Sequence, residues 1–233
     1  LNDLKLRDDT IVVYFSDNGP NSYRWNGGMK GRKGSIDEGG LRSPFFIRWP
    51  GRIPAGASIP QIAGAIDLLP TLADLADLNV KATQPLDGRS LRPLLLDESS
   101  DWKPRSLFAT RRSQVSVRTQ RFRLDATGRL FDIGADLGQT SDGAFQHPKL
   151  AARLKKQANQ HAEEMQRHFQ ANAARPFTVG YGTSTTLPAR DGVEHGTIQR
   201  SSKAPNNSFF TNWTQIDDYI TWDIDVGDSG TFE

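Results

Sequence analysis

The feature that most constrains the fold is an unbroken apolar run at residues 11–15 that stops abruptly at the polar residues 16–19. A continuous run of β-branched and aromatic residues, without alternation, is typical of a strand covered on both faces in a parallel sheet. In open α/β sheets, ligands bind in the crevice outside the carboxyl ends of the strands. We therefore predict that Asp17 and Asn18 lie at a ligand-binding edge of such a sheet.

Asp17 and Asn18 offer a carboxylate and an amide carbonyl, the hard oxygen ligands that divalent cations such as Ca²⁺ and Mg²⁺ prefer. The alternative interpretation is an ordinary turn, because Asn18-Gly19-Pro20 is common turn chemistry. These residues alone leave both interpretations open.

A basic, glycine-rich segment follows at residues 27–42. Its glycines allow the backbone to approach a ligand closely, and its Lys and Arg side chains suit a tetrahedral anion. A nucleotide-binding P-loop requires Gly-Lys-Ser/Thr in that order, and Lys33-Gly34-Ser35 inverts it. The alternative is a solvated charged loop at residues 30–33. The cations of the segment are Lys30, Arg32, Lys33 and Arg42.

Four motifs, in one order, resemble those of formylglycine-dependent sulfatases, which are members of the alkaline phosphatase superfamily. They are the Ser-Asp-Asn-Gly strand end at 16–19, the Gly-x-Lys-Gly loop at 31–34, Glu-Gly-Gly-x-Arg-x-Pro at 38–44 and Trp-Pro-Gly at 49–51. The chain departs from the family at Lys30, where Arg is frequent, and at Ser43, where Val is common. The resemblance implies that Asp17 and Asn18 are ligands of an active-site Ca²⁺. It also implies that Lys33 is a catalytic residue that contacts the sulfate group.

By the same resemblance, the expected reaction is hydrolysis of a sulfate ester, in which Ca²⁺ and Lys33 neutralise charge on the sulfuryl oxygens. The family's nucleophile is a formylglycine made from Cys or Ser within Cys/Ser-x-Pro-x-Arg. The chain contains no Cys, and neither Ser43-Pro44 nor Ser58-Ile59-Pro60 fits that pattern. We therefore expect the formylglycine and the remaining metal ligands to lie upstream, and this chain alone to be inactive.

Two alternatives to a sulfatase stay open. A phosphodiesterase or phosphonate hydrolase of the same superfamily would act on a similar tetrahedral group and would need a second metal site. A non-catalytic fragment would use the basic loop merely to hold a sulfated polysaccharide.

Charge narrows the class of partner. The net charge is +2, but residues 206–233 carry six acids and no Lys or Arg, so residues 1–205 are at +8. This fits an anionic ligand such as a sulfate ester or a sulfated carbohydrate. Nucleic acid is not expected, because no helix carries a basic stripe interleaved with aromatics.

The resemblance implies a periplasmic or secreted protein. No apolar run approaches the length of a membrane span. No signal peptide is visible, but Leu1 is not an initiator Met, and we expect the true N-terminus to be missing.

We predict an α/β fold with three parts. Residues 1–96 form the C-terminal part of an alkaline-phosphatase-like sheet domain, in which Asp67 caps a helix. Residues 97–172 form a small subdomain, with antiparallel strands at 106–110, 115–124 and 129–133 and an amphipathic helix that begins at Pro148. Residues 173–233 form a partial β-rich module, and the alternation at 220–226 predicts one strand there.

His161 and His168 lie seven residues apart on the predicted helix. No third ligand stands at a useful spacing, so we favour packed or solvated histidines over a metal site.

Overall fold

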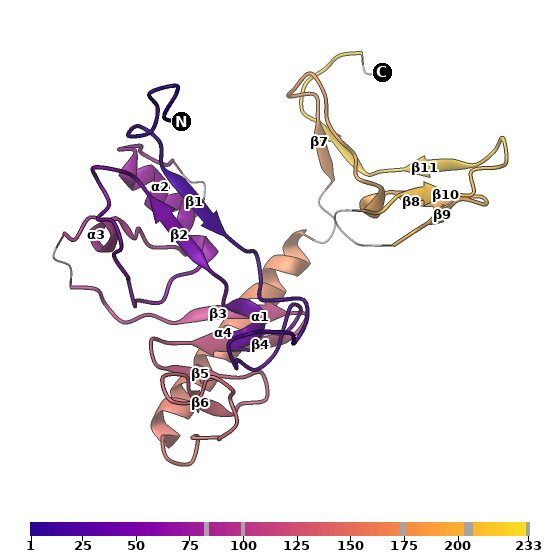
Figure 1. Ribbon diagram of the computed structural model, residues 1–233. Coiled ribbons are helices and arrows are strands. Elements are labelled where there is room, and N and C mark those ends of the chain that lie inside the picture. Colours follow the sequence, from indigo (N-terminus) through magenta and orange to yellow (C-terminus); the bar gives the residue numbers. More distant parts are fainter. Residues whose placement is uncertain (82–83, 99–100, 173–175, 203–206, 232–233) are drawn as a thin grey trace. The chain divides into compact units, whose positions relative to one another are not determined.

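The computed structural model describes residues 1–81, 84–98, 101–172, 176–202 and 207–231, and it shows a mixed α/β chain built from small sheets (Figure 1). The chain divides into two compact units, residues 1–165 and 166–233. The division predicted at 96/97 and 172/173 stays a prediction, and residues 173–175 lie outside the described residues. Within the described ranges, no helix is long and apolar enough to cross a membrane.

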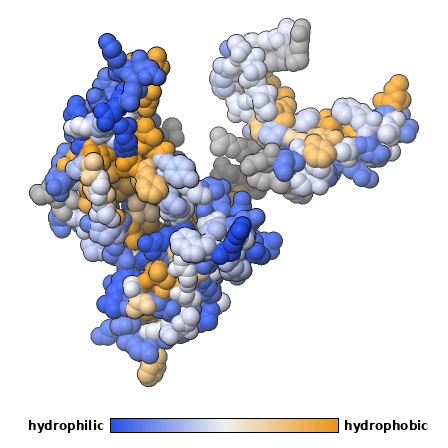
Figure 2. Space-filling model, in the orientation of Figure 1, coloured by the Kyte–Doolittle hydropathy of each residue, from blue (hydrophilic) through white to orange (hydrophobic). Residues whose placement is uncertain are grey.

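The predicted strand at the start of the chain forms, but its surroundings differ from the expectation. Strand β1 (Val12–Phe15) pairs antiparallel with β2 (Phe45–Arg48), with Tyr14 opposite Phe46. The prediction of a parallel strand buried on both faces is therefore wrong for the described chain. Tyr14 is 65% exposed and Phe46 64% exposed, and Figure 2 shows apolar surface over this two-stranded ribbon. The continuous apolar run predicted the strand correctly but not the direction of its partner.

Two short helices pack against this two-stranded ribbon. Helices α2 (Leu68–Leu75) and α3 (Arg92–Leu95) contribute Leu75 and Leu95 to a small apolar core, against which Ile11 and Ile47 pack. The packing of apolar side chains between the ribbon and the helices holds this half of the first unit together.

Asp67 is structural, as predicted, and it stands at the N-cap position of α2, but its side chain does not bond to that helix. It ends a 3₁₀ turn, η1 (Ala65–Asp67), and makes no side-chain capping bond to α2. Its fully buried carboxylate instead accepts hydrogen bonds from the Gly64 and Arg89 amides at 2.9 and 2.8 Å. Arg105 Nη1 lies 2.8 Å from the same carboxylate, so the buried charge is paired.

The predicted antiparallel meander is confirmed as a four-stranded sheet in the order β3-β4-β5-β6. Its strands are β3 (Leu107–Arg111), β4 (Gln114–Arg118), β5 (Phe122–Leu124) and β6 (Leu130–Asp132). The strand expected at 115–124 is split in two, because the Thr119 amide bonds back to the Phe122 carbonyl at 2.8 Å and closes a turn.

Helix α4 (Pro148–Asn172) begins at the predicted proline, and its apolar stripe covers the four-stranded sheet (Figure 1). Leu154 and Ala158 are buried against Val117, Leu124 and Leu130. His161, on the same helix, stacks on Phe108 with ring centroids 4.5 Å apart. This contact fits the packed histidine favoured from the sequence.

In the described residues of the second unit, three strand pairs and the 3₁₀ turn η2 (Ala189–Asp191) follow the end of α4. The pairs are β7 (Phe177–Val179) with β12 (Ile224–Val226), β8 (Val193–His195) with β11 (Tyr219–Thr221), and β9 (Gln199–Arg200) with β10 (Phe210–Thr211). The single strand predicted at 220–226 is wrong, since its ends join different sheets. Trp222 makes the break: its ring packs edge-on against Phe210, and its Nε1 donates to the Pro188 carbonyl at 3.0 Å.

Asp218 organises the loop before β11. Its carboxylate accepts two hydrogen bonds from Thr197, through the hydroxyl and the amide, both at 2.7 Å. The Thr214 and Gln215 amides donate to it as well, at 3.1 and 3.0 Å. These bonds, the one from the Thr197 side chain first, lower the pKa of Asp218 to about 2.

Candidate functional site

The polar end of β1 and the glycine-rich segment are bound to each other through their backbones. The Gly19 amide donates to the Gly40 carbonyl at 2.9 Å, and the Lys33 amide donates to the Pro20 carbonyl, also at 2.9 Å. The structure thus brings the predicted metal ligands and the predicted sulfate-binding lysine into one cluster of loops.

Two glycines show why this segment is glycine-rich. A Cβ at Gly19 would lie 1.9 Å from the Gly39 carbonyl oxygen, so no side chain fits between the two loops. Gly31 has φ +86°, and a Cβ there would lie 2.2 Å from Ser35 Oγ. Both positions therefore need glycine, one for close approach and one for the left-handed backbone as well.

Asp17 and Asn18 present oxygen atoms that the described chain does not use. Asp17 is exposed and Asn18 half-buried, and within the described ranges neither side chain makes a hydrogen bond or an ion pair. The turn that carries them is held through other atoms, since Ser16 Oγ donates to the Asn18 carbonyl at 2.9 Å. This donor set fits a hard divalent cation.

The same two residues cannot complete a coordination shell. Calcium takes about six to eight oxygen ligands. No group of three or more His, Cys, Asp or Glu side chains able to hold a metal ion occurs in the part of the chain that the structure describes. Asp17 and Asn18 therefore fit a Ca²⁺ site as a minority of its ligands.

The cations of the loop differ in their surroundings. Lys33 is exposed and has no acidic partner in the described ranges, and the exposed Arg32 lies with its guanidinium 5.2 Å from the Tyr23 ring centroid. Lys30 is half-buried and paired with acids, unlike a residue of a fully solvated charged loop. Its Nζ lies 3.2 Å from an Asp37 carboxylate oxygen and 3.7 Å from one of Asp125. Lys30 therefore holds the loop in place, whereas Lys33 stays available to an anion.

A buried ion-pair network ties the loop to the four-stranded sheet. Glu38 opens the short helix α1 (Glu38–Leu41) and is 3% exposed. One of its carboxylate oxygens lies 2.8 Å from Arg123 Nη2 and 3.1 Å from Arg118 Nε. Burial alone would raise the pKa of Glu38, but the two guanidinium groups outweigh it and lower that pKa. The charged carboxylate is therefore the stable form in the fold.

Sequence reasoning missed this network. Glu38 lies 85 residues from Arg123 and 80 residues from Arg118, and neither arginine belongs to a motif. The one available signal was that Arg123 interrupts an apolar strand pattern, since a charged residue at such a position needs a partner.

Comparison with known proteins shows what the first part of the chain resembles. The family model described as Sulfatase matches residues 1–78, which include Asp17, Asn18 and Lys33. Arylsulfatase A of Homo sapiens is 43% identical over 101 residues, which is 41% of this chain and 20% of that protein. The first third of the chain is therefore similar to sulfatases.

Solved structures share the mixed α/β fold of most of this chain. The crystal structure of Ps i-CgsB superposes with a TM-score of 0.62 at 24% identity, over 75% of this chain and 44% of that one. The structure of BT4656 in complex with its substrate D-glucosamine-2-N,6-O-disulfate gives a TM-score of 0.50 at 26% identity, over 74% and 37% of the chains. The chain spans about a fifth of the length of the curated sulfatases that it matches.

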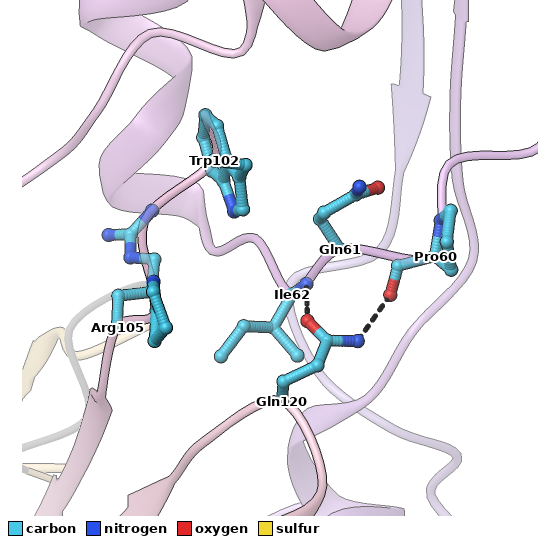
Figure 3. A pocket seen from close by; sticks show the side chains of 7 residues that line it. Pro60, Gln61, Ile62, Trp102, Arg105 and Gln120 are labelled. Carbon is cyan, nitrogen blue, oxygen red and sulfur yellow. Dashed lines mark hydrogen bonds between the residues drawn. The ribbon is translucent and has the colours of Figure 1, made fainter. Parts of the chain in front are cut away.

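A cleft of about 320 Å³ lies elsewhere in the chain (Figure 3). Its lining residues are Pro60, Gln61, Ile62, Trp102, Pro104, Arg105 and Gln120. The Gln120 side chain accepts from the Ile62 amide at 3.0 Å and donates to the Pro60 carbonyl at 2.7 Å, and Arg105 pairs with Asp67. Because these polar groups are already engaged and no predicted site residue lines the cleft, we do not assign it to the active site.

Proposed function

We propose that the protein that carries this chain hydrolyses sulfate esters, with Asp17 and Asn18 as two ligands of Ca²⁺ and Lys33 as the residue that binds the sulfate group. The observation that carries the proposal is the hydrogen bond from the Lys33 amide to the Pro20 carbonyl. This bond joins the backbone of Lys33, which has no acidic partner among the described residues, to the turn after Asp17 and Asn18, and all three residues lie in the segment that matches the sulfatase family model.

The proposed roles follow from charge. A bound Ca²⁺ would withdraw electron density from the sulfuryl oxygens. The Asp17 carboxylate and the Asn18 amide oxygen would hold that cation at the strand end. The Lys33 ammonium would donate a hydrogen bond to a sulfuryl oxygen and stabilise the charge that shifts as the bond to the leaving alcohol breaks. We expect formylglycine to be the nucleophile, and no residue of this chain supplies it.

We further propose a sulfated carbohydrate as the substrate class and a periplasmic or secreted location. The structural neighbour in complex with a disulfated glucosamine supports the substrate class. Residues 1–205 carry a charge of +8, because the chain's net charge is +2 and the six acids that lie in residues 206–233 are not counted in it. This positive charge would attract a polyanionic glycan.

The test compares Lys33→Ala with Arg32→Ala in the protein that carries this chain. Arg32 is a matched control because it is a neighbouring, exposed cation of the same loop. Loss of Lys33 should cost about 2 to 4 kcal/mol of transition-state stabilisation, by analogy with removal of one donor from an oxyanion site. Arg32→Ala should change kcat/KM on an aryl sulfate only slightly, because surface charges contribute little.

Mass spectrometry should first show the formylglycine in each variant. Equal and salt-sensitive losses at both positions would mean that the loop only steers anions, and the assignment of Lys33 would be withdrawn. Faster hydrolysis of phosphate diesters than of sulfate esters would instead favour the phosphodiesterase alternative.

A further inference from the structure

Gln139 reaches from the turn after β6 into the glycine-rich loop and bonds to it twice. Its Oε1 accepts a hydrogen bond from the Glu38 amide at 2.9 Å, and its Nε2 donates to an Asp37 carboxylate oxygen at 3.2 Å. The side chain is only 4% exposed. One buried amide therefore satisfies both the first amide of α1 and the side chain that precedes the helix.

The same turn holds the start of the loop. The Lys30 amide donates to the Leu137 carbonyl at 3.2 Å, and Lys30 Nζ lies 3.2 Å from the Asp37 oxygen that Gln139 also contacts. Residues 137–139 thus grip the loop at Lys30 and at Asp37, on either side of Lys33.

The backbone at Gln139 is in an unfavourable conformation. Its φ is +50°, in the left-handed region that residues other than glycine rarely adopt. The conformation is held by Asp136, whose carbonyl accepts from the Gln139 amide at 3.2 Å and whose carboxylate accepts from the Thr140 amide at 2.7 Å. A non-glycine residue keeps such a conformation where its surroundings impose it, and such positions cluster at functional sites.

The hydrogen bonds of this turn and of α1 reach the loop at Lys30, three residues before Lys33. Asp37 precedes α1 and Glu38 begins it, and the Gly39 amide of that helix donates to the Lys30 carbonyl at 2.7 Å. The Lys33 amide lies on the same closed loop and is bound to Pro20. A shift of the start of α1 would therefore move Lys33 relative to Asp17 and Asn18.

We propose that Gln139 is a positioning residue that fixes the loop carrying Lys33 by clasping Asp37 and the start of α1. This inference rests on the proposed function for its catalytic consequence. Its structural part, the clasp itself, can be measured without any substrate.

The variant Gln139→Glu keeps an acceptor for the Glu38 amide but places a second carboxylate beside Asp37. In the protein that carries this chain, kcat/KM on an aryl sulfate should fall about a hundredfold near neutral pH, mainly through kcat, as expected for a misplaced catalytic group. Adding Asp37→Asn should restore much of the loss, because an asparagine amide can donate to the new carboxylate. A purely structural role predicts no rescue, since the second substitution also removes the partner of Lys30.

The matched control is Asp142→Ala. In the wild type, the Asp142 carboxylate accepts hydrogen bonds from the Leu130 and Ala144 amides and, within the described ranges, makes no hydrogen bond to the loop of Lys33. Gln139→Leu should accelerate hydrogen exchange at the Gly39 and Lys33 amides at least tenfold, and Asp142→Ala should not. Unchanged exchange in Gln139→Leu, equal acceleration in both variants, or no rescue by Asp37→Asn would overturn the clasp. If Gln139→Leu exchanges faster but the wild-type protein does not hydrolyse sulfate esters, the structural role of Gln139 stands and the proposed function is wrong.

Discussion

At the scale of single residues, buried charge is the main constraint on the site. Glu38 and Arg123 are each 3% exposed, and their side chains meet at 2.8 Å. A buried ion pair adds little net stability, but removal of one partner leaves an uncompensated charge in the interior. Ser116 Oγ and the Ile36 carbonyl, which both accept from Arg123 Nη1 at 3.1 Å, satisfy further donors of that guanidinium.

We predict that Glu38→Gln destabilises the fold by about 3 to 5 kcal/mol near neutral pH, because Arg123 and Arg118 then stay buried without their counter-ion. The folded-state pKa of Glu38 lies below its ordinary value of 4.5. Its stabilisation is therefore present above that pH and is lost as the pH falls through the folded-state pKa. Urea unfolding between pH 7 and pH 3 should show a steeper acid loss in the wild type than in the variant.

The exposed pair of Arg121 with Asp132 offers a control at the edge of the same sheet. Its loss through Arg121→Gln should leave the stability near neutral pH almost unchanged, because solvent screens exposed pairs. Parallel pH profiles for the wild type and Glu38→Gln would contradict the predicted role of Glu38.

At the scale of elements, the four-stranded sheet holds the glycine-rich loop through ion pairs, and helix α4 packs against that sheet. Arg118 lies in β4 and Arg123 in β5, and apolar side chains of the same sheet pack against α4. Val117, Leu124 and Leu154 are each at most 2% exposed in the shared core. Burial of these side chains is what keeps the two arginines in register with Glu38.

We predict that Leu154→Ala costs about 2 to 5 kcal/mol, through lost transfer free energy and the cavity that remains under the sheet. Lys155→Ala, at the next and exposed position of α4, should change the free energy of unfolding by less than about 0.5 kcal/mol. Circular dichroism during urea titration measures both variants. Similar losses at the two positions would mean that α4 is held by its propensity and not by the core contact.

At the scale of the whole chain, the site residues are present in part. The chain spans 20% of human arylsulfatase A, and it supplies two of the oxygen ligands that the proposal assigns to Ca²⁺. The aromatic ribbon of β1 and β2 exposes apolar side chains (Figure 2).

We predict that the chain of 233 residues binds Ca²⁺ weakly and shows no sulfatase turnover. Ca²⁺ takes about six to eight oxygen ligands, and two fall short of that number. The chain also contains no Cys/Ser-x-Pro-x-Arg segment. Titration calorimetry should give weak binding that Asp17→Ala abolishes. Tight binding unchanged by Asp17→Ala, or aryl sulfate hydrolysis above a heat-killed control, would refute this.

The sequence by itself determined the local features: the strand before Asp17, the glycine-rich loop, the antiparallel meander and the start of α4 at Pro148. These follow from apolar periodicity, turn residues and helix signals within about ten to twenty residues, so they can be read without a partner. The family motifs also lie in one short stretch, and the Sulfatase family model matches residues 1–78, which contain them.

Only the tertiary structure decided what surrounds those features. The antiparallel partner of β1, the pairing of Lys30, the ion pair of Glu38 with Arg123 and the clasp at Gln139 all join distant parts of the chain; Gln139 and Glu38 are 101 residues apart. Such contacts leave no periodic trace, because a single polar residue has the same local pattern whether water or a buried charge faces it. The position of Lys33 depends on these contacts. The local sequence identifies Lys33 as a candidate site residue but does not predict where it lies in the fold.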